Sequence, residues 1–460
     1  MKPETSFFTP PRPSRIFIPM NPATSWRWLA GLGGFLTICV ATIAQTTAPT
    51  TQPAPRAAVN GNPIRVNPHT GHVSNYDESK IGTYTLPDPL VLSNGQPVRD
   101  ADTWFKQRRP ELLKIYQTEI YGAVPANAPA VTWKVASTDP AAMNGTAIGK
   151  HLIGHVGSAV DGPQWNVTMY TPAHAAGPVP LILCINFPSA APRVRSATAP
   201  VTAPPVPGGD PVADILARGW GYATITYTDI QPDAATTFSA GVIHLALAAG
   251  EIKPAPDQWG TISAWAWGLS RIVDYFQTDA AVDGHQIALM GHSRLGKTVL
   301  WAGAQDPRFV AVYSSCAGEM GSSLARRDYG ETVDDMATNF PWQFAGNFQK
   351  YMGHWNDLPV DTHMMIALNA PHPVFITGGV GDQWADPRGE FLAEVAAGPV
   401  YRLVGRSDLG TRDFPAVNSP IITGDLGFNY HAEGHAATPG DWRAFLTFLS
   451  RYVRTPAAKS

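Results

Sequence analysis

Short apolar runs that alternate with helix-patterned stretches are the feature that most restricts the fold of this chain. Residues 179–186 form a continuous apolar run, and residues 222–227 and 286–290 form two more. A strand that is buried on both faces has this pattern. Strands that alternate with helices build a parallel sheet covered by helices on both sides. The sequence therefore predicts an α/β sandwich of three layers.

The other expected elements continue this alternation. Helices are expected at 104–121, 261–276, 361–369, 387–396 and 440–452. Further strands are expected at 309–314, 373–377 and 400–404, with an early antiparallel pair at 151–155 and 165–170. A long insertion occupies 321–359. In sheets of this kind the functional site lies at the carboxyl ends of the strands.

Composition narrows the possible partners. Hydrophobic residues make up 44% of the 460 residues and charged residues only 15%, so the chain can bury a large core. The net charge is −3 and no basic stripe is present, which argues against nucleic acid as a partner. Three cysteines, Cys39, Cys184 and Cys316, do not make a disulfide scaffold. We expect a monomer.

The first residues have the pattern of an export signal. Trp26 and Arg27 precede an uncharged apolar run at 28–43, and small residues follow it. The run has about 16 residues, whereas a membrane span needs ~20. We expect residues 1–44 to be cleaved, with Met1 or Met20 as the start, and no stable membrane association afterwards. An uncleaved anchor helix is the alternative. Residues 45–59, rich in Thr, Pro and Ala, read as a linker before one domain at 60–460.

The sequence GHSRLGK at 291–297 carries the strongest chemical signal. It directly follows the strand expected at 286–290 and precedes a helical stretch. A serine at such a sharp turn is a nucleophile elbow, which places Ser293 at a helix N-terminus whose N–H groups can stabilise an oxyanion. Gly291 stands two residues before the serine as required, but Leu295 replaces the usual second glycine. The alternative is an ordinary serine in a strand–helix turn.

A base is expected on the loop before the last helix, because the chain order in this fold is serine, acid, histidine. Two histidines lie there, His431 and His435. His435 is beside Gly434 and nearer the helix, so we assign it as the base. His431 is expected to end the last strand and to pack.

The acid that orients the base is expected after the penultimate strand. Asp382 is the first carboxylate after the strand at 373–377, and we assign it this role. Asp386 precedes a proline and a helix, so it is expected to cap that helix. Glu319, after the strand at 309–314, is the second possible acid.

Histidine spacing gives only weak evidence for a metal. The pairs His69/His72, His151/His155 and His431/His435 have ligand-like spacing. No third ligand accompanies any of them, and 151–155 is an expected strand. The sequence therefore predicts no metal and no cofactor.

These motifs resemble those of the glucuronoyl esterases, a carbohydrate esterase family of the α/β-hydrolase superfamily, and in particular its bacterial branch. The resemblance covers nearly the whole chain after the linker. It rests on the segments at 75–78, 86–90, 108–111, 121–122, 291–297, 358–363, 382–387 and 434–435.

The resemblance implies an α/β-hydrolase fold and a secreted or periplasmic serine esterase. Its substrate would be an ester of (4-O-methyl-)glucuronic acid on xylan, with a lignin-type alcohol as the leaving group. Arg294 would stabilise the oxyanion through its N–H and its guanidinium. Lys297 and Glu331 would bind the uronate hydroxyls, and Trp384 would pack on the sugar. Taken singly, Lys297 also reads as a solvated helix residue and Trp384 as a core aromatic.

Two residues depart from the family pattern. His292 stands where fungal members have a cysteine, so that disulfide is absent. Cys316 falls where the family's usual catalytic glutamate stands, which leaves the acid to Asp382 or, failing that, to Glu319. Two other functions stay open: an acetyl xylan or other carbohydrate esterase on the same scaffold, and a non-catalytic carbohydrate-binding relative. A deacetylase would have no use for the uronate-binding Lys297.

Overall fold

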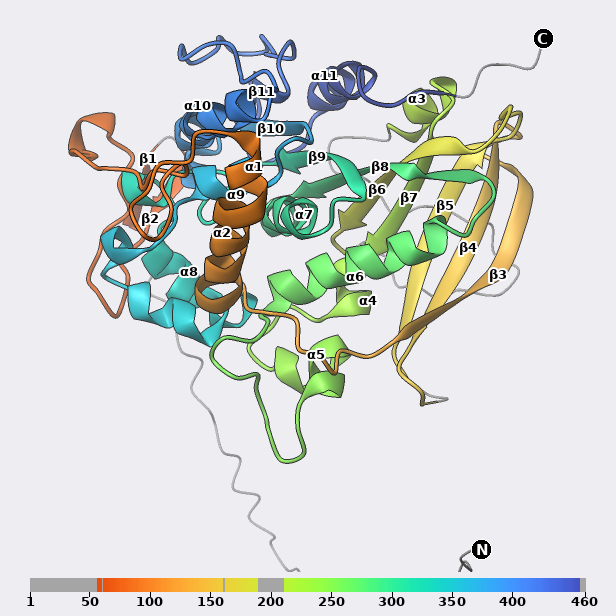
Figure 1. Cartoon of the computed structure of the whole chain (residues 1–460), viewed down its shortest axis with the longest axis horizontal. Coiled ribbons are helices and arrows are strands. Elements are labelled where there is room, and N and C mark those ends of the chain that lie inside the picture. Colours follow the sequence, from red (N-terminus) through yellow and green to blue (C-terminus); the bar gives the residue numbers. More distant parts are fainter. Residues whose placement is uncertain (1–55, 60, 160–161, 189–210, 456–460) are drawn as a thin grey trace, which may run out of the picture. The chain divides into compact units, whose positions relative to one another are not determined.

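A single mixed sheet organises the chain in the computed structural model, which describes residues 56–59, 61–159, 162–188 and 211–455. Within these ranges nine strands lie in the order β11-β10-β9-β8-β6-β7-β5-β4-β3 (Figure 1). The parallel strands are β6 (Val179–Asn186), β7 (Gly221–Thr226), β8 (Val282–His292), β9 (Phe309–Ser315), β10 (Val374–Gly379) and β11 (Leu426–His431). The antiparallel strands are β3 (Val131–Ala142), β4 (Ala147–Val156) and β5 (Gln164–Pro172). The predicted α/β fold and the early antiparallel pair are confirmed.

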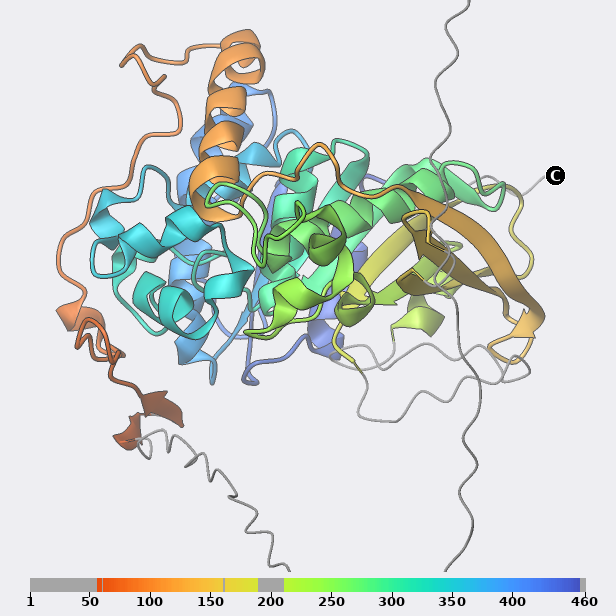
Figure 2. The same ribbon diagram turned by 90° about the horizontal axis from the view of Figure 1, so that it is seen from below.

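Helices cover both faces of the sheet. One face carries α6 (Thr261–Phe276), α7 (Arg294–Gln305), α9 (Thr362–Leu368) and α10 (Pro387–Leu403). The opposite face carries α3 (Val212–Ala217) and α11 (Pro439–Leu449), which lie across the sheet from α6 and α7 in Figure 1. In Figure 2 the green helices of residues 241–276 lie in front of the sheet, and the yellow-to-orange antiparallel strands extend to one side.

The alternation within β6 divides the interior into two cores. Leu181, Leu183 and Ile185 pack with α6 and α7, whereas Ile182 and Cys184 pack with α3 and α11. Successive side chains of a strand point to opposite faces, so a strand covered on both sides must be apolar throughout. This is the physical reason for the continuous apolar run at 179–186.

Shorter elements complete the fold. They are β1 (Arg56–Val59), β2 (Asn62–Ile64), α1 (Ala101–Thr103), α2 (Arg109–Ile115), α4 (Tyr227–Ile230), α5 (Gly241–Ala246) and α8 (Val333–Asn339). Two π-helical segments, Trp104–Arg108 and Tyr116–Ile120, flank α2, so that residues 101–120 form one long helical rod, as the spacing predicted. The insertion at 321–359 consists of α8 and short 3-10 turns.

The strand expected at 400–404 is wrong, because these residues form the last turn of α10. Pro399 lies inside this helix, which continues to Leu403. Ala397, Val400 and Tyr401 are fully buried at helical spacing. Tertiary packing of this face outweighs the local preference of a Pro-Val sequence for extended structure.

Part of the stretch that the sequence indicated as linker forms a strand. Arg56–Val59 already forms β1, which pairs antiparallel with β2, inside the stretch expected to be linker. Pairing with a later segment cannot be read from composition. The expected signal at 1–44 and the first part of the linker lie outside the described residues. In the part of the chain that the structure describes, no helix combines the length and apolarity of a membrane span.

The carboxyl ends of four neighbouring strands meet at one edge of the sheet. His292 of β8 pairs with Ser315 of β9, and Gly379 of β10 pairs with His431 of β11. The loops that follow these strands therefore start side by side. They hold Ser293, Cys316, Asp382 and His435, which brings residues more than a hundred positions apart into one place.

Candidate active site

Ser293 occupies a strained turn between β8 and α7. Its backbone angles are φ 59° and ψ −131°, a left-handed region that non-glycine residues rarely adopt. A Cβ at Gly291 would lie 2.1 Å from the carbonyl oxygen of Leu295, so only glycine fits there. The predicted elbow geometry is therefore present, with the serine at the N-terminus of a helix of twelve residues.

The missing second glycine of the elbow has a structural explanation. The side chain of Leu295 is fully buried in the core between α7 and the sheet. The close approach falls one residue later, because a Cβ on Gly296 would lie 2.8 Å from Ser314 Oγ and 2.9 Å from Ala317 Cβ. Gly296 thus lets α7 pack tightly against the loop after β9.

His435 and Asp382 are joined by a short hydrogen bond. Nδ1 of His435 lies 2.6 Å from Oδ2 of Asp382, and Asp382 is buried while His435 is exposed. The imidazole of His292, the residue before Ser293, has its centroid 4.6 Å from that of His435. A buried carboxylate on Nδ1 fixes the tautomer and directs Nε2 away from the acid.

Two other histidines, His431 and His292, lie near His435 and are buried. His431 ends β11 as expected and is fully buried, with Nδ1 3.0 Å from Asp441 Oδ2 and Nε2 3.0 Å from the Gly434 carbonyl oxygen. Asp441 in turn closes the capping box of α11 with Thr438. Burial, with smaller contributions from His435 and His431, lowers the pKa of His292 to about 3, so its ring is neutral.

Asp386 caps a helix, as the sequence predicted. Its carboxylate accepts a hydrogen bond from the Gly389 N–H at 2.9 Å at the start of α10. It also pairs with Nε of Arg327 at 2.8 Å. Burial raises the pKa of Asp386 to about 6 in spite of this pairing.

Glu319, the second possible acid, does not pair with His435. In the described part of the chain, the carboxylate partner of His435 is Asp382. Glu319 is buried, and its Oε1 has no hydrogen-bond partner. Burial and the nearby Asp361 raise its pKa well above the usual value, so a neutral carboxyl group is favoured there.

Cys316 lies against the His435–Asp382 pair. It directly follows β9 with φ 48°, is buried, and donates from Sγ to the Ala436 carbonyl oxygen at 3.5 Å. Its Sγ, a ring nitrogen of His435 and a carboxylate oxygen of Asp382 all lie within 4.8 Å of one another. Burial, followed by the charge of Asp382, raises the pKa of the Cys316 thiol well above its usual value. Cys316 and Cys184 are both free thiols.

Among the described residues, Cys316, Asp382 and His435 form a group of three side chains that are able to bind a metal ion together. The histidine pairs considered from the sequence are not its source, apart from His435. His72 pairs instead with Asp328 at 2.7 Å. His151, on β4, contacts Asn166 on β5 at 3.2 Å. Sequence spacing missed the cluster because its members come from three separate loops.

Arg294 is held by a partner that the sequence did not reveal. Its guanidinium pairs with the buried carboxylate of Asp233 and lies 5.1 Å from the ring centroid of Phe340. The other oxygen of Asp233 accepts hydrogen bonds from Trp342 at 2.6 Å and Gln343 at 2.9 Å. Asp233 belongs to no recognisable motif, so sequence alone offered no signal for it.

Lys297, Glu331 and Trp384 form a connected row, although they come from three distant segments. Nζ of Lys297 lies 3.6 Å from Oε2 of Glu331, and Nε1 of Trp384 donates to Oε1 of the same carboxylate at 2.9 Å. Lys297 is only 3% exposed, so the reading of a solvated helix residue is wrong. Burial lowers the pKa of Lys297, and the charge of Glu331 opposes this shift.

An N-terminal segment reaches the same row. The side-chain oxygen of Asn62 accepts a hydrogen bond from the backbone N–H of Trp384 at 3.2 Å. The side-chain nitrogen of Asn62 donates to the Gly381 carbonyl oxygen at 3.3 Å. The guanidinium of Arg65 lies 4.5 Å from the centroid of the Trp384 ring, in cation–π range. Trp384 is half-buried rather than a core aromatic, and one of its faces carries this arginine.

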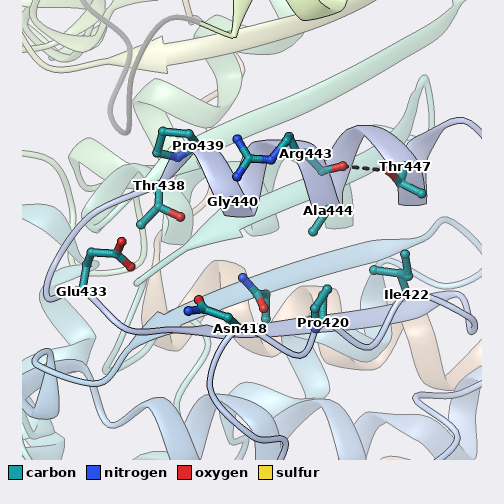
Figure 3. Close-up of a pocket in the computed structure, with 11 residues that line it drawn as sticks. Asn418, Pro420, Ile422, Glu433, Thr438, Pro439, Gly440, Arg443, Ala444 and Thr447 are labelled. Atoms are coloured by element: carbon teal, nitrogen blue, oxygen red, sulfur yellow. Dashed lines mark hydrogen bonds between the residues drawn. The ribbon is translucent and has the colours of Figure 1, made fainter.

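A cavity of about 670 Å³ lies beside α11. It is lined on one side by α11 and on the other by the chain at 418–422 (Figure 3). Glu433 and Thr438, which flank His435 in sequence, line one end of it. Figure 3 shows Arg443 on α11 and Asn418 on the facing chain at its walls.

A family model, a curated protein and a solved structure that match this chain are all carbohydrate or glucuronoyl esterases. A family model described as fungal glucuronyl esterase matches residues 252–405. A carbohydrate esterase from an unknown prokaryotic organism is 36% identical over 82% of this chain and 92% of its own length. A solved glucuronoyl esterase from Solibacter usitatus is 38% identical, with a TM-score of 0.75, over 81% of this chain and 99% of that one.

A more distant relative extends the match to fungi. A 4-O-methyl-glucuronoyl methylesterase of Schizophyllum commune is 25% identical over 72% of this chain and 76% of its own length. The chain therefore belongs to the glucuronoyl esterase family of carbohydrate esterases, which are carboxylic-ester hydrolases with an α/β-hydrolase fold.

Proposed function

We propose that this chain is a serine esterase that hydrolyses esters of (4-O-methyl-)glucuronic acid. Ser293 is the nucleophile, His435 the base and Asp382 the acid. The observation that supports this most is the 2.6 Å bond between His435 and the buried Asp382, on loops that start beside the strained Ser293. Glucuronoyl esters are also what the relatives' names state as their substrates.

The reaction is acyl transfer. Ser293 Oγ attacks the uronoyl carbonyl carbon and gives its proton to Nε2 of His435, while Asp382 stabilises the imidazolium. The carbonyl oxygen becomes an oxyanion near the start of α7, where the N–H of Arg294 can donate to it. His435 returns the proton to the leaving alcohol. Water, activated by the same histidine, then releases the uronate from Ser293.

Recognition of the acyl part involves the row beside the elbow. Lys297 and Glu331 offer one donor and one acceptor group that are held 3.6 Å apart, which suits adjacent sugar hydroxyls. The half-buried Trp384 offers an indole edge and face at the end of this row. Asp233 holds the Arg294 guanidinium between two rings, where a cation can stabilise the oxyanion or a substrate oxygen.

The natural setting follows from the same proposal. With residues 1–44 as a cleaved signal, the enzyme acts outside the cytoplasm on lignin–carbohydrate ester linkages of glucuronoxylan.

The proposed substrate is tested by an assay of the purified protein on benzyl glucuronate and on acetylated xylan, with Ser293→Ala assayed in parallel. Release of uronate that depends on Ser293, with little deacetylation, supports the proposal. Deacetylation without uronate release would leave the triad but refute the substrate.

A further inference from the structure

The loops after β9, β10 and β11 bring a thiol, a carboxylate and an imidazole together. Cys316, Asp382 and His435 each place one ligand atom within 4.8 Å of the other two. A sulfur, a nitrogen and an oxygen donor in one cluster are typical of zinc sites, which take Cys, His and Asp side chains. The proposed esterase mechanism uses two of these residues and leaves Cys316 without a role.

We propose that Cys316, Asp382 and His435 form a Zn²⁺-binding site that blocks the catalytic base when it is occupied. The binding of the ion stands on the geometry of the three side chains alone. Its effect on turnover rests on the proposed function, because it requires His435 to be the base.

The separation of the donors is compatible with one bound ion after a small adjustment. In a tetrahedral site with Zn–S of about 2.3 Å and Zn–N of about 2.0 Å, ligand atoms stand about 3.3–3.8 Å apart. The Nδ1–Oδ2 distance of 2.6 Å must therefore widen, and the sulfur must approach. The side chain of His435 is 45% exposed, whereas those of Asp382 and Cys316 are buried. The histidine can thus move, and it also provides the route by which the ion enters.

Proton balance explains why the bound ion stops catalysis. The Cys316 thiol releases its proton to solvent and binds as a thiolate. Nδ1 of His435 becomes a ligand, so the single proton of the neutral imidazole must reside on Nε2. A protonated Nε2 cannot accept the proton of Ser293. One proton leaves per ion bound, no group changes oxidation state, and a chelator reverses the reaction.

Cys184 offers a matched control within the same chain. It is likewise a free, fully buried cysteine, but it lies in the middle of β6 in the core under α3 and α11. It belongs to no cluster of ligating side chains in the described residues. A general consequence of removing a buried thiol would appear in variants of either cysteine, whereas a built site involves Cys316 alone.

Direct binding tests the site without an activity assay. The intact protein is titrated with Zn²⁺ by calorimetry and with Co²⁺ by absorption, where a thiolate ligand gives a sulfur-to-cobalt charge-transfer band. The wild type and Cys184→Ala should bind one ion and show the band. Cys316→Ala should lose the band and bind at least about 10-fold more weakly, since even outer-shell partners contribute 10–100-fold. A wild type without the band, or equal Zn²⁺ affinity in Cys316→Ala, would overturn the proposal.

Turnover provides the second readout. Zn²⁺ should inhibit ester hydrolysis by the wild type and by Cys184→Ala, with recovery after addition of chelator, and Cys316→Ala should resist it. Cys316→Ser serves if the alanine variant does not fold, because a hydroxyl is a poor zinc ligand. Inhibition that is the same in both Cys316 variants and the wild type would refute the switch. If the protein proves inactive on uronate esters, the cobalt band still decides whether the site exists.

Discussion

The indole of Trp384 and the carboxylate of Glu331 are linked by a hydrogen bond of 2.9 Å, although the two residues belong to different loops. The other oxygen of Glu331 lies 3.6 Å from Nζ of the buried Lys297. Glu331 therefore holds a lysine and a tryptophan in one row. The family pattern suggested three separate contacts with the sugar, but the structure makes them a single unit.

Replacement of Glu331 should thus damage substrate binding through all three residues. We expect Glu331→Gln to lower kcat/KM on benzyl glucuronate by about 10–100-fold, because a hydrogen bond to a charged group contributes ~1.5–3 kcal/mol. Most of the loss should fall on KM. The matched control is Glu433→Gln, an exposed glutamate on the loop that also holds His435. Equal effects of the two substitutions in steady-state kinetics would contradict this role.

Asp382 and Glu319 differ sharply in what they contact, and kinetics can separate them. Asp382→Asn removes the acceptor for Nδ1 of His435, and we expect kcat to fall by about 10³–10⁴-fold, the size seen when a triad acid is lost. Glu319→Gln keeps the shape of a buried group that favours its neutral form, so kcat should change little. Thermal unfolding of both variants controls for folding. A greater loss of kcat in Glu319→Gln would reverse the assignment.

The parts of the fold that the sequence predicted are those governed by local pattern. The helix expected at 261–276 and the strand expected at 179–186 have those bounds in the structure, because continuous apolar runs and helical spacing directly reflect burial. The wrong strand at 400–404 shows the limit. There the burial of Val400 and Tyr401 in the hydrophobic core decides the conformation, and that burial is invisible before the fold is known.

In the candidate site, too, some residues could be predicted from the sequence and others could not. Ser293, Asp382 and His435 could be placed from their positions after successive strands, since strand ends share one edge of a parallel sheet. Asp233 and Arg65 could not, because each acts through a contact with a distant residue, Arg294 and Trp384 respectively. Neither has a local signature. A contact between two single residues that are far apart in the chain leaves no pattern that can be read from one sequence.

Arg65 gives the N-terminal segment a testable role in the site. Its guanidinium lies over Trp384, and such a contact contributes about 0.5–1 kcal/mol at exposed positions. We expect Arg65→Ala to raise KM for glucuronate esters by about 2–5-fold with kcat unchanged. Lys106→Ala, an exposed cation paired with Asp102 on the helical rod, is the control. An unchanged KM in Arg65→Ala would show that the stacked arginine does not order the indole.

Glu390 links the loop after β9 to α10 and makes stability depend on pH. Its Oε1 accepts hydrogen bonds from the Gly318 N–H at 3.0 Å and Ser322 Oγ at 2.6 Å, while its Oε2 is buried without a partner. Burial raises the pKa of Glu390 from 4.5 to about 8, against the effect of these donors. The folded protein therefore keeps this proton over a range of pH in which the unfolded chain has lost it.

The sign of the effect follows from this difference in proton binding. Between pH 4.5 and 8 the folded state holds one more proton at Glu390, so raising the pH removes about 1.4 kcal/mol of unfolding free energy per unit. Below pH 4.5 both states are protonated and the contribution is constant. Glu390→Gln keeps the acceptor oxygen and cannot ionise. Denaturant unfolding across this range should show its stability rising relative to wild type with pH. Parallel pH profiles for the two proteins would mean that Glu390 ionises normally in the folded state.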